Sequence, residues 1–405
     1  MNLPKVYLVN ICVQYLLSVF WLLIILYVIL NGENFHLNSN LFASMLIFIG
    51  FLDLLLGVLA DKISVKITLS IGAVSFMIAS LLRILDNLEL NNVSYLFFGI
   101  SIASINGSLQ VWSLEYNNTY GKKLSDISLL GNIHICRRFA QALNIATPFL
   151  IAFNNQTPWI LCIIFGFISL YIILSSNIGK KSISNLSPNL SAESIFNISA
   201  LKKIALIVIA FGMIFYGIEF GIRNIIITPY VYLDLNDGNV QNLWLQVFVQ
   251  VISGLSGNLL YNKLIKRYDT LSKTFLIGIA LAIYGVANYV SYLTTSYYTW
   301  LLFSGFAVFS MGWYFPVLDA LIIESCPAHY KTTFISITTA IYYIAGGIFL
   351  KLNYLSIDID SFRYWWLISS YSLFIAAGIF LSIDFYFMLK KVGNVSNKHL
   401  SLKRR

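Results

Sequence analysis

The chain has 405 residues, of which 58% are hydrophobic and 11% are charged, and its formal net charge is +9. Soluble domains carry about a quarter charged residues, so this composition excludes a soluble globular protein and indicates many membrane spans. The four cysteines lie scattered in apolar segments without metal-ligand spacing. They predict neither a metal site nor a disulfide framework, and we expect no cofactor.

Apolar runs long enough to cross a bilayer, which takes about 20 residues in a helix, recur twelve times along the chain. The predicted spans are residues 6–30, 41–60, 67–84, 93–116, 133–154, 158–176, 203–232, 240–262, 271–294, 297–323, 332–354 and 362–389. Residues 177–202 are polar, rich in Ser and Asn, and contain Pro188. We therefore expect a six-helix bundle over 1–176, a cytoplasmic linker over 177–202, a second six-helix bundle over 203–389 and a basic cytoplasmic tail over 390–405.

The basic residues alternate along the chain as the positive-inside rule describes. With the N-terminus in the cytoplasm, the Lys and Arg residues outside the predicted cytoplasmic segments are Arg83, Arg223, Lys351 and Arg363. The positive charge is therefore a topology signal, and we expect no nucleic-acid partner. Both termini are placed in the cytoplasm. The abundance of Asn, Ile, Lys, Tyr and Phe is typical of an AT-rich bacterial gene. Together with the predicted spans, it leads us to expect a multi-pass protein of the bacterial inner membrane.

The stretch GVLADKISVK joins the second and third predicted spans and contains Gly57, Asp61, Lys62 and Lys66. Glycine lets two helices approach closely, and an aspartate at a helix end suits a basic loop residue or the N-terminus of another helix. A contact that forms in one conformation and breaks in another is a latch. The alternative interpretation is that Asp61 and Lys62 only cap and solubilise a tight turn.

This stretch resembles the loop signature of the major facilitator superfamily, Gly-x-x-x-Asp-Lys-x-(small)-x-Lys. GNLLYNKLIKR occupies the equivalent loop of the second half, which indicates an internal repeat. FLDLLLGVLADK and NGSLQVWSLEYN resemble the second and fourth spans of a drug-exporter-like branch, with Asp53 in place of Glu and Leu55 in place of Pro. CPAHYKTTFISI resembles the pattern before span eleven. The chain departs from the family in lacking the fourth-span arginine of many proton-coupled members. Its fifth-span antiporter signature is reduced to Ala-Thr-Pro.

The resemblance implies an all-α integral membrane protein with twelve transmembrane helices in two six-helix bundles, a central site between the halves and transport by alternating access. A charge near the bilayer centre costs about 3 kcal/mol or more, so each buried charged residue is a candidate for the site. Asp53 and Gln110 lie at similar depth, and Asp53 is a candidate proton carrier; the alternative is a structural pair with Arg137 or Arg138. Asp319 on span ten is a candidate for carrying a proton or binding a cationic group.

Glu219 and Arg223 lie four residues apart on one face of span seven. They form either an intrahelical ion pair or a binding site for a charged substrate. Polar residues also recur at helical spacing on spans one and eight, where they include Gln14, Gln246 and Gln250. We expect them to line a water-filled central path. His134 and His329 are placed near the cytoplasmic face without a ligand role. The predicted cytoplasmic gate consists of Gly57, Asp61, Lys62, Lys66, Glu115, Arg137, Arg138 and Lys331.

These features predict a monomeric secondary transporter in the lipid bilayer that exports a small amphipathic organic solute, coupled to a proton or another cation. A drug or a peptide or nucleoside antibiotic fits this description, and self-immunity is a special case. The first alternative is an uptake symporter for a small nutrient. A membrane-embedded enzyme is the second, and the sequence contains no catalytic constellation that would support it.

Overall fold

The computed structural model describes residues 3–30, 35–85, 88–120, 124–176, 178, 200–228, 231, 235–236, 242–267, 272–327, 330–356 and 361–402. Each of the twelve predicted spans corresponds to a helix or to consecutive helices in this part of the chain. Nine of the described helices are long and apolar enough to cross a membrane. The predicted linker lies almost entirely outside the described residues, as does His329.

The first group of helices runs from α1 to α8. Its elements are α1 (Leu3–Leu30), α2 (Phe35–Lys62), α3 (Val65–Ile84), α4 (Leu88–Ile105), α5 (Ser108–Tyr120), α6 (Asp126–Leu143), η1 (Asn144–Ala146), α7 (Thr147–Phe153) and α8 (Thr157–Ser175). The fourth predicted span is divided between α4 and α5 because Gly107 has a φ of 67°, which favours glycine. The fifth comprises α6, η1 and α7, and Pro148 lies in the first turn of α7.

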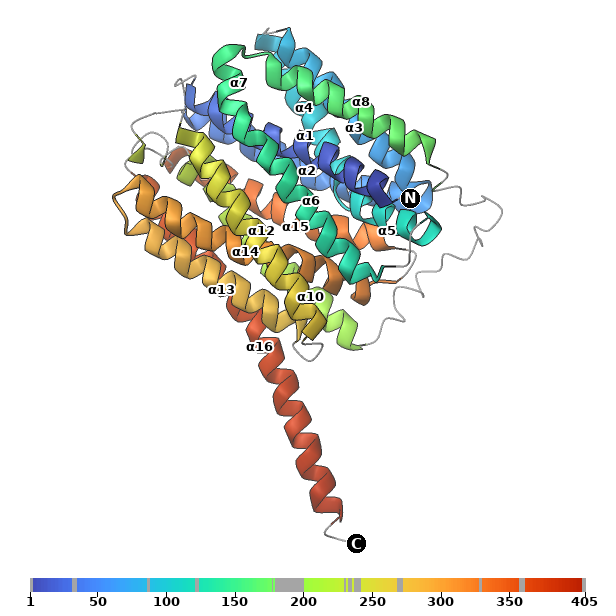
Figure 1. Ribbon diagram of the computed structural model, residues 1–405. Coiled ribbons are helices and arrows are strands. Elements are labelled where there is room, and N and C mark those ends of the chain that lie inside the picture. The colour runs from blue at the N-terminus through green and yellow to red at the C-terminus, as the bar shows by residue number, and fades with distance from the viewer. Residues whose placement is uncertain are drawn as a thin grey trace.

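The second group runs from α10 to α16. Its elements are α10 (Ala200–Ile222), η3 (Arg223–Ile227), α12 (Leu243–Arg267), α13 (Lys273–Tyr292), α14 (Tyr297–Ser325), α15 (Lys331–Asn353), η6 (Tyr354–Ser356) and α16 (Phe362–Leu402). The segment η3 is a π-helical turn that continues α10, and such turns are frequent at functional sites. The helix α16 continues past residue 389 to Leu402, and its end projects from the body of the molecule (Figure 1).

The two groups lie against each other with their helices running in similar directions (Figure 1). Two helix pairs make the main contacts between them: α2 with α15, and α6 with α12. Glycines permit the first approach, because a Cβ on Gly50 or Gly57 would lie 2.5 Å from a side-chain atom of α15. Large apolar side chains such as Phe51, Leu55 and Phe167 are exposed on the outer surface, as a lipid-facing surface requires.

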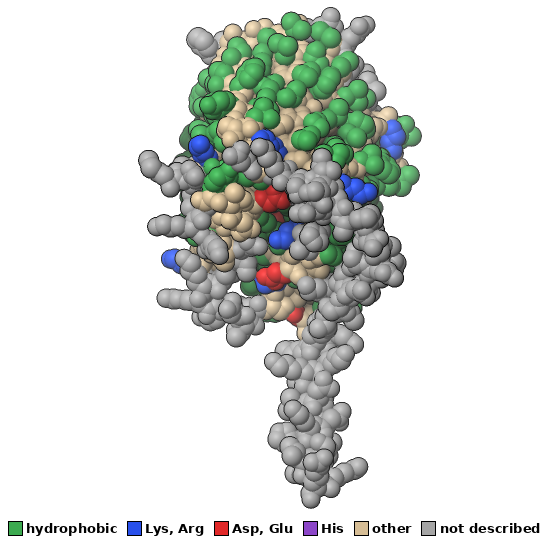
Figure 2. Space-filling view, turned by 90° about the vertical axis from the view of Figure 1, so that its right-hand side faces the viewer, with side chains coloured by type: hydrophobic (Ala, Val, Ile, Leu, Met, Phe, Trp, Pro, Cys, Tyr) green, Lys and Arg blue, Asp and Glu red, His purple; other side chains and the backbone are tan. Residues whose placement is uncertain are grey.

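Charged side chains gather on one end of the molecule, below a largely apolar surface (Figure 2). Lys62 and Lys263 are both exposed, and Lys273 forms an ion pair of 2.7 Å with Glu324 on the surface. The same end contains the contact of Asp61 with the start of α15. We call it the latch end.

Gly257 lies where α12 crosses α14. A Cβ at this position would lie 2.1 Å from the carbonyl oxygen of Phe309 and 3.0 Å from the Cα of Gly312. Backbone atoms of a packed helix cannot move aside as a flexible side chain can. The crossing therefore depends on the absence of a side chain at Gly257.

We expect Gly257→Ala to destabilise the protein by about 1–3 kcal/mol, since overpacking forces the two backbones apart. Gly378→Ala on α16 is the matched control because nothing lies within 4 Å of its added Cβ. The control should be neutral or stabilise by up to about 1 kcal/mol through helix propensity. Thermal unfolding of the purified proteins in detergent compares them. Equal melting temperatures for the two variants would contradict the prediction.

Candidate functional site

A cavity of about 390 Å³ lies between the two helix groups, within the size range of small-molecule sites. It follows α14 from Trp300 near the start of that helix to Ile322 near its end. Both groups contribute to its wall. The charged and amide side chains that line it are Gln14, Asn106, Gln110, His134, Arg137, Arg138, Gln141, Asn144, Arg223, Asn224, Gln246, Gln250, Asn288 and Asp319.

Asp53 lies directly behind this wall and is fully buried. Its Oδ2 accepts a hydrogen bond of 3.1 Å from Asn106 Nδ2 and another from the hydroxyl of Thr339 on α15. Its Oδ1 has no partner among the described groups. Asn106 and Thr339 both line the cavity, so one layer of side chains separates the carboxyl from it. The alternative interpretation, an ion pair of Asp53 with an arginine of span five, is wrong: the described partners are an amide and a hydroxyl.

Glu219 and Arg223 form the predicted ion pair, with 3.6 Å between Arg223 Nε and Glu219 Oε1. The hydroxyl of Tyr284 on α13 donates to the same carboxylate and accepts from Arg223 Nη1. Glu219 is fully buried, whereas the side chain of Arg223 is 32% exposed and lines the cavity together with Tyr284. The two predicted interpretations are therefore compatible: an ion pair holds an arginine that faces the cavity.

His134 and Asp319 meet across the two helix groups. His134 Nε2 on α6 lies 2.9 Å from Asp319 Oδ2 on α14, and both side chains are buried. The expectation that His134 has no ligand role near the cytoplasmic face overlooked this contact, because His134 lines the cavity. Its spacing of four residues from Arg138 was the available signal, since i and i+4 share a helix face.

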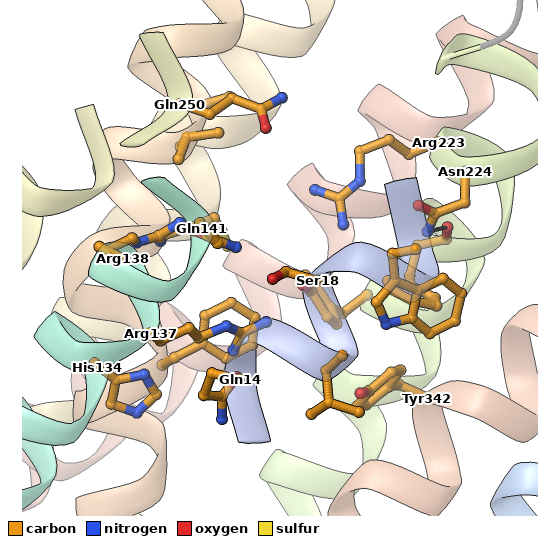
Figure 3. A pocket seen from close by; sticks show the side chains of 18 of the residues that line it. Gln14, Ser18, His134, Arg137, Arg138, Gln141, Arg223, Asn224, Gln250 and Tyr342 are labelled. Carbon is orange, nitrogen blue, oxygen red and sulfur yellow. Dashed lines mark hydrogen bonds between the residues drawn. The ribbon is translucent and has the colours of Figure 1, made fainter. Parts of the chain in front are cut away.

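Arg137 and Arg138 were predicted at the gate, but the structure places both on the cavity wall, one turn of α6 after His134 (Figure 3). The guanidinium of Arg137 lies 5.2 Å from the ring centre of Phe315. Arg138 Nη1 donates to Gln141 Oε1 at 2.9 Å. Gln14, Gln246 and Gln250 also line the cavity, as helical spacing predicted, and so does Gln110, which was predicted from its depth.

The remaining predicted gate residues lie outside the cavity lining. Asp61 accepts hydrogen bonds from the backbone N–H groups of Thr332 (3.2 Å) and Thr333 (2.7 Å) and from the Thr333 hydroxyl (2.7 Å). These groups belong to the first turn of α15, so the carboxylate caps a helix of the other group. A Cβ on Gly57 would lie 2.5 Å from Ser336 Cβ on the same helix.

The lysines of the loop stretch behave differently from Asp61. Lys66 Nζ donates to the carbonyl oxygens of Leu174 and Ser176, each at 2.6 Å, and so joins α3 to the end of α8 within the first group. Lys62 is exposed. Glu115 and Lys331, the other predicted gate residues, line no part of the cavity. Asp61 and Gly57 thus contact α15 of the second group, and Arg137 contacts the Phe315 ring of α14.

Aromatic side chains form the apolar part of the wall. The ring centre of Phe220 lies 5.5 Å from that of Trp21 and 5.4 Å from that of Tyr342. Tyr216 and Phe315, whose ring centres lie 6.1 Å apart, extend this cluster. Sequence reasoning noted the aromatic abundance of the chain but did not single out Trp21, Tyr216, Phe220 or Phe315. Their signal is weak, because aromatic residues also fill membrane cores.

No family model and no curated relative matches the sequence. Solved structures do. The D-xylose-proton symporter matches with a TM-score of 0.69 and 15% sequence identity, and the match covers 93% of this chain and 96% of the symporter chain. The human organic anion transporter MFSD10 matches with a TM-score of 0.69 and 11% sequence identity, and the match covers 94% of this chain and 97% of the MFSD10 chain. FucP in the outward conformation, a major facilitator superfamily transporter, matches with a TM-score of 0.65 and 14% sequence identity. The match covers 93% of this chain and 98% of the FucP chain. The chain therefore has the all-helical, multi-pass membrane fold of the major facilitator superfamily transporters.

Proposed function

We propose that the chain is a secondary transporter that works by alternating access. The observation that carries this proposal is the cavity of about 390 Å³, to which both helix groups contribute the wall. Among the contacts that join the groups, Asp61 binds the start of α15 outside the cavity lining, and His134 meets Asp319 in the cavity wall. Rocking of the groups about the cavity would break one set of contacts and open the site to the other side.

Export of an amphipathic organic solute is the proposed direction and substrate class. The aromatic cluster offers an apolar surface, and the amides and arginines around it offer hydrogen-bond donors and acceptors. Asp53 is the proposed proton carrier, since its carboxyl contacts Asn106 in the cavity wall and Thr339 of the other group. The drug-exporter resemblance of the loop and span motifs supports the direction.

Uptake by symport is the second candidate. It is favoured by the likeness of the fold to a D-xylose-proton symporter and to a fucose:proton symporter. Both candidates use the same cavity and the same cycle, so they differ in the sign of the coupled flux.

Cells with and without the gene, screened for growth against a panel of amphipathic antibiotics, test the function. An exporter lowers the cellular content of a labelled compound, and an uncoupler restores that content. A symporter raises the content, and an uncoupler abolishes the increase. Identical growth and identical content in both cell types across the panel would contradict the proposal.

A further inference from the structure

Some charged side chains of the cavity wall have a partner of opposite charge among the described residues, and others do not. Asp319 is engaged by His134, and Arg223 is engaged by Glu219. Arg137 and Arg138 have no carboxylate at ion-pair distance among the described side chains. Their described contacts are the Phe315 ring and the Gln141 amide, which are both neutral.

An arginine without a counter-charge is expensive inside a membrane protein. Arg138 is only 8% exposed, so bulk water does not replace the missing carboxylate. The two guanidinium groups also stand on consecutive residues, and their like charges repel each other. An anion in the cavity would supply the missing counter-charge and stabilise this arrangement.

The surroundings of Arg138 are shaped to hold its guanidinium. A Cβ on Gly254 of α12 would lie 2.4 Å from both Cζ and Nε of Arg138. The absent side chain therefore leaves the room that the guanidinium occupies. Figure 3 shows Arg137 and Arg138 entering from α6 on one side, while Arg223 reaches into the same space from the other.

We propose that the solute is an amphipathic organic anion. Its carboxylate binds between Arg137 and Arg138, and its apolar body contacts the cluster of Trp21, Phe220 and Tyr342. The planar guanidinium fork matches a carboxylate with two parallel hydrogen bonds. This inference rests on the proposed transport function and specifies its substrate class.

Binding of three probes with one ring system tests the charge class: 2-naphthoate, 2-naphthamide and 2-naphthylmethylammonium. Each is titrated into purified protein at constant ionic strength, and the apparent melting temperature is recorded, because a bound ligand stabilises the folded state. We expect naphthoate to bind at least about tenfold more tightly than the amide, since charge-assisted hydrogen bonds are the stronger ones. The ammonium probe should bind most weakly.

Three variants in the cavity wall and one control outside it locate the effect. Arg137→Gln and Arg138→Gln should each abolish the preference for naphthoate over naphthamide. Gly254→Ala keeps both charges but displaces the Arg138 guanidinium, and should weaken naphthoate binding alone. Lys263→Gln removes an exposed charge outside the cavity lining and should leave the preference unchanged. Removing a charge that has no carboxylate partner should not lower the melting temperature of the free protein, so we expect the Arg137→Gln and Arg138→Gln proteins to remain folded.

The proposal is overturned if no probe stabilises the wild-type protein, if the amide or the ammonium binds as tightly as naphthoate, or if the preference survives both arginine substitutions. Different results refute the substrate class and the transport function. Transport of a cationic compound that naphthoate does not inhibit would refute the substrate class and leave the transporter intact. Selective naphthoate binding without transport in liposomes would support the site and refute the function.

Discussion

Replacing Asp61 with Asn is expected to shift the protein away from the conformation in which α2 and α15 are joined at the latch end. The carboxylate accepts three hydrogen bonds from the first turn of α15, at 2.7–3.2 Å. Asn retains one acceptor oxygen and loses the negative charge that the helix N-terminus favours. We expect a loss of about 2 kcal/mol in the joined conformation, or a roughly 30-fold change in the equilibrium.

The rate at which a cysteine in the contact reacts with a maleimide measures this change. Thr332 is fully buried beside Asp61, and the four native cysteines are buried. In a Thr332→Cys background, Asp61→Asn should raise the labelling rate roughly 30-fold, in proportion to the open population. Glu324→Gln is the matched control, because it removes an acid from an exposed ion pair worth about 0–1 kcal/mol. Equal labelling rates in the Asp61→Asn and control proteins would show that the contact is not a latch.

The contact also illustrates what the sequence can and cannot specify. The motif around Gly57 predicted that Asp61 meets a basic residue or a helix N-terminus, and the structure shows the second. It could not name Thr333, which lies 272 residues away along the chain. Helix periodicity determines which face of a helix is polar, but the partner on another helix follows from tertiary packing.

The same limit explains His134 and the two arginines after it. The positive-inside rule assigns Lys and Arg near a span end to the cytoplasm, so it placed Arg137 and Arg138 at the gate. In the structure α6 begins earlier than predicted, at Asp126, because the Ser125 side chain caps it. His134, Arg137 and Arg138 therefore lie well inside α6, where they line the cavity, and not at its end. A window that counts apolar residues overlooks the polar first turns of α6.

The existence and order of the spans were the most predictable features, because each crossing of a bilayer needs about 20 apolar residues. The division of the fourth span at Gly107 was missed. Its sequence, Asn-Gly, is a turn signal, but the apolar residues on both sides favour one continuous helix. The added side chain of any residue other than glycine would lie 3.1 Å from Ser336 Oγ and 3.2 Å from the Thr332 carbonyl oxygen. Both the positive φ of Gly107 and its close contact with α15 therefore favour glycine at the interruption.

Asp53→Asn is expected to separate solute movement from the proton gradient. The carboxyl is fully buried, and it contacts Asn106 in the cavity wall and Thr339 of the other helix group. A group in this position senses both the occupant of the cavity and the approach of the two helix groups. Asn preserves the shape and can still accept from Thr339, but it cannot take up or release a proton. Coupling free energies of about 1–3 kcal/mol predict a 5- to 150-fold loss of gradient-driven flux.

Proteoliposomes with an imposed pH gradient provide the measurement, and solute exchange without a gradient provides the internal control. Asp53→Asn should lose gradient-driven accumulation and retain exchange, whereas Glu324→Gln should retain both. Asp319→Asn distinguishes the two candidate carriers, because it removes the carboxyl of the His134–Asp319 contact and leaves Asp53 intact. If Asp319→Asn reproduces the loss and Asp53→Asn does not, the His134–Asp319 contact carries the coupling proton, and Asp53 only secures α2 against α15. Retention of full gradient-driven transport in both variants would exclude both carboxyls, because a carrier that cannot ionise cannot couple.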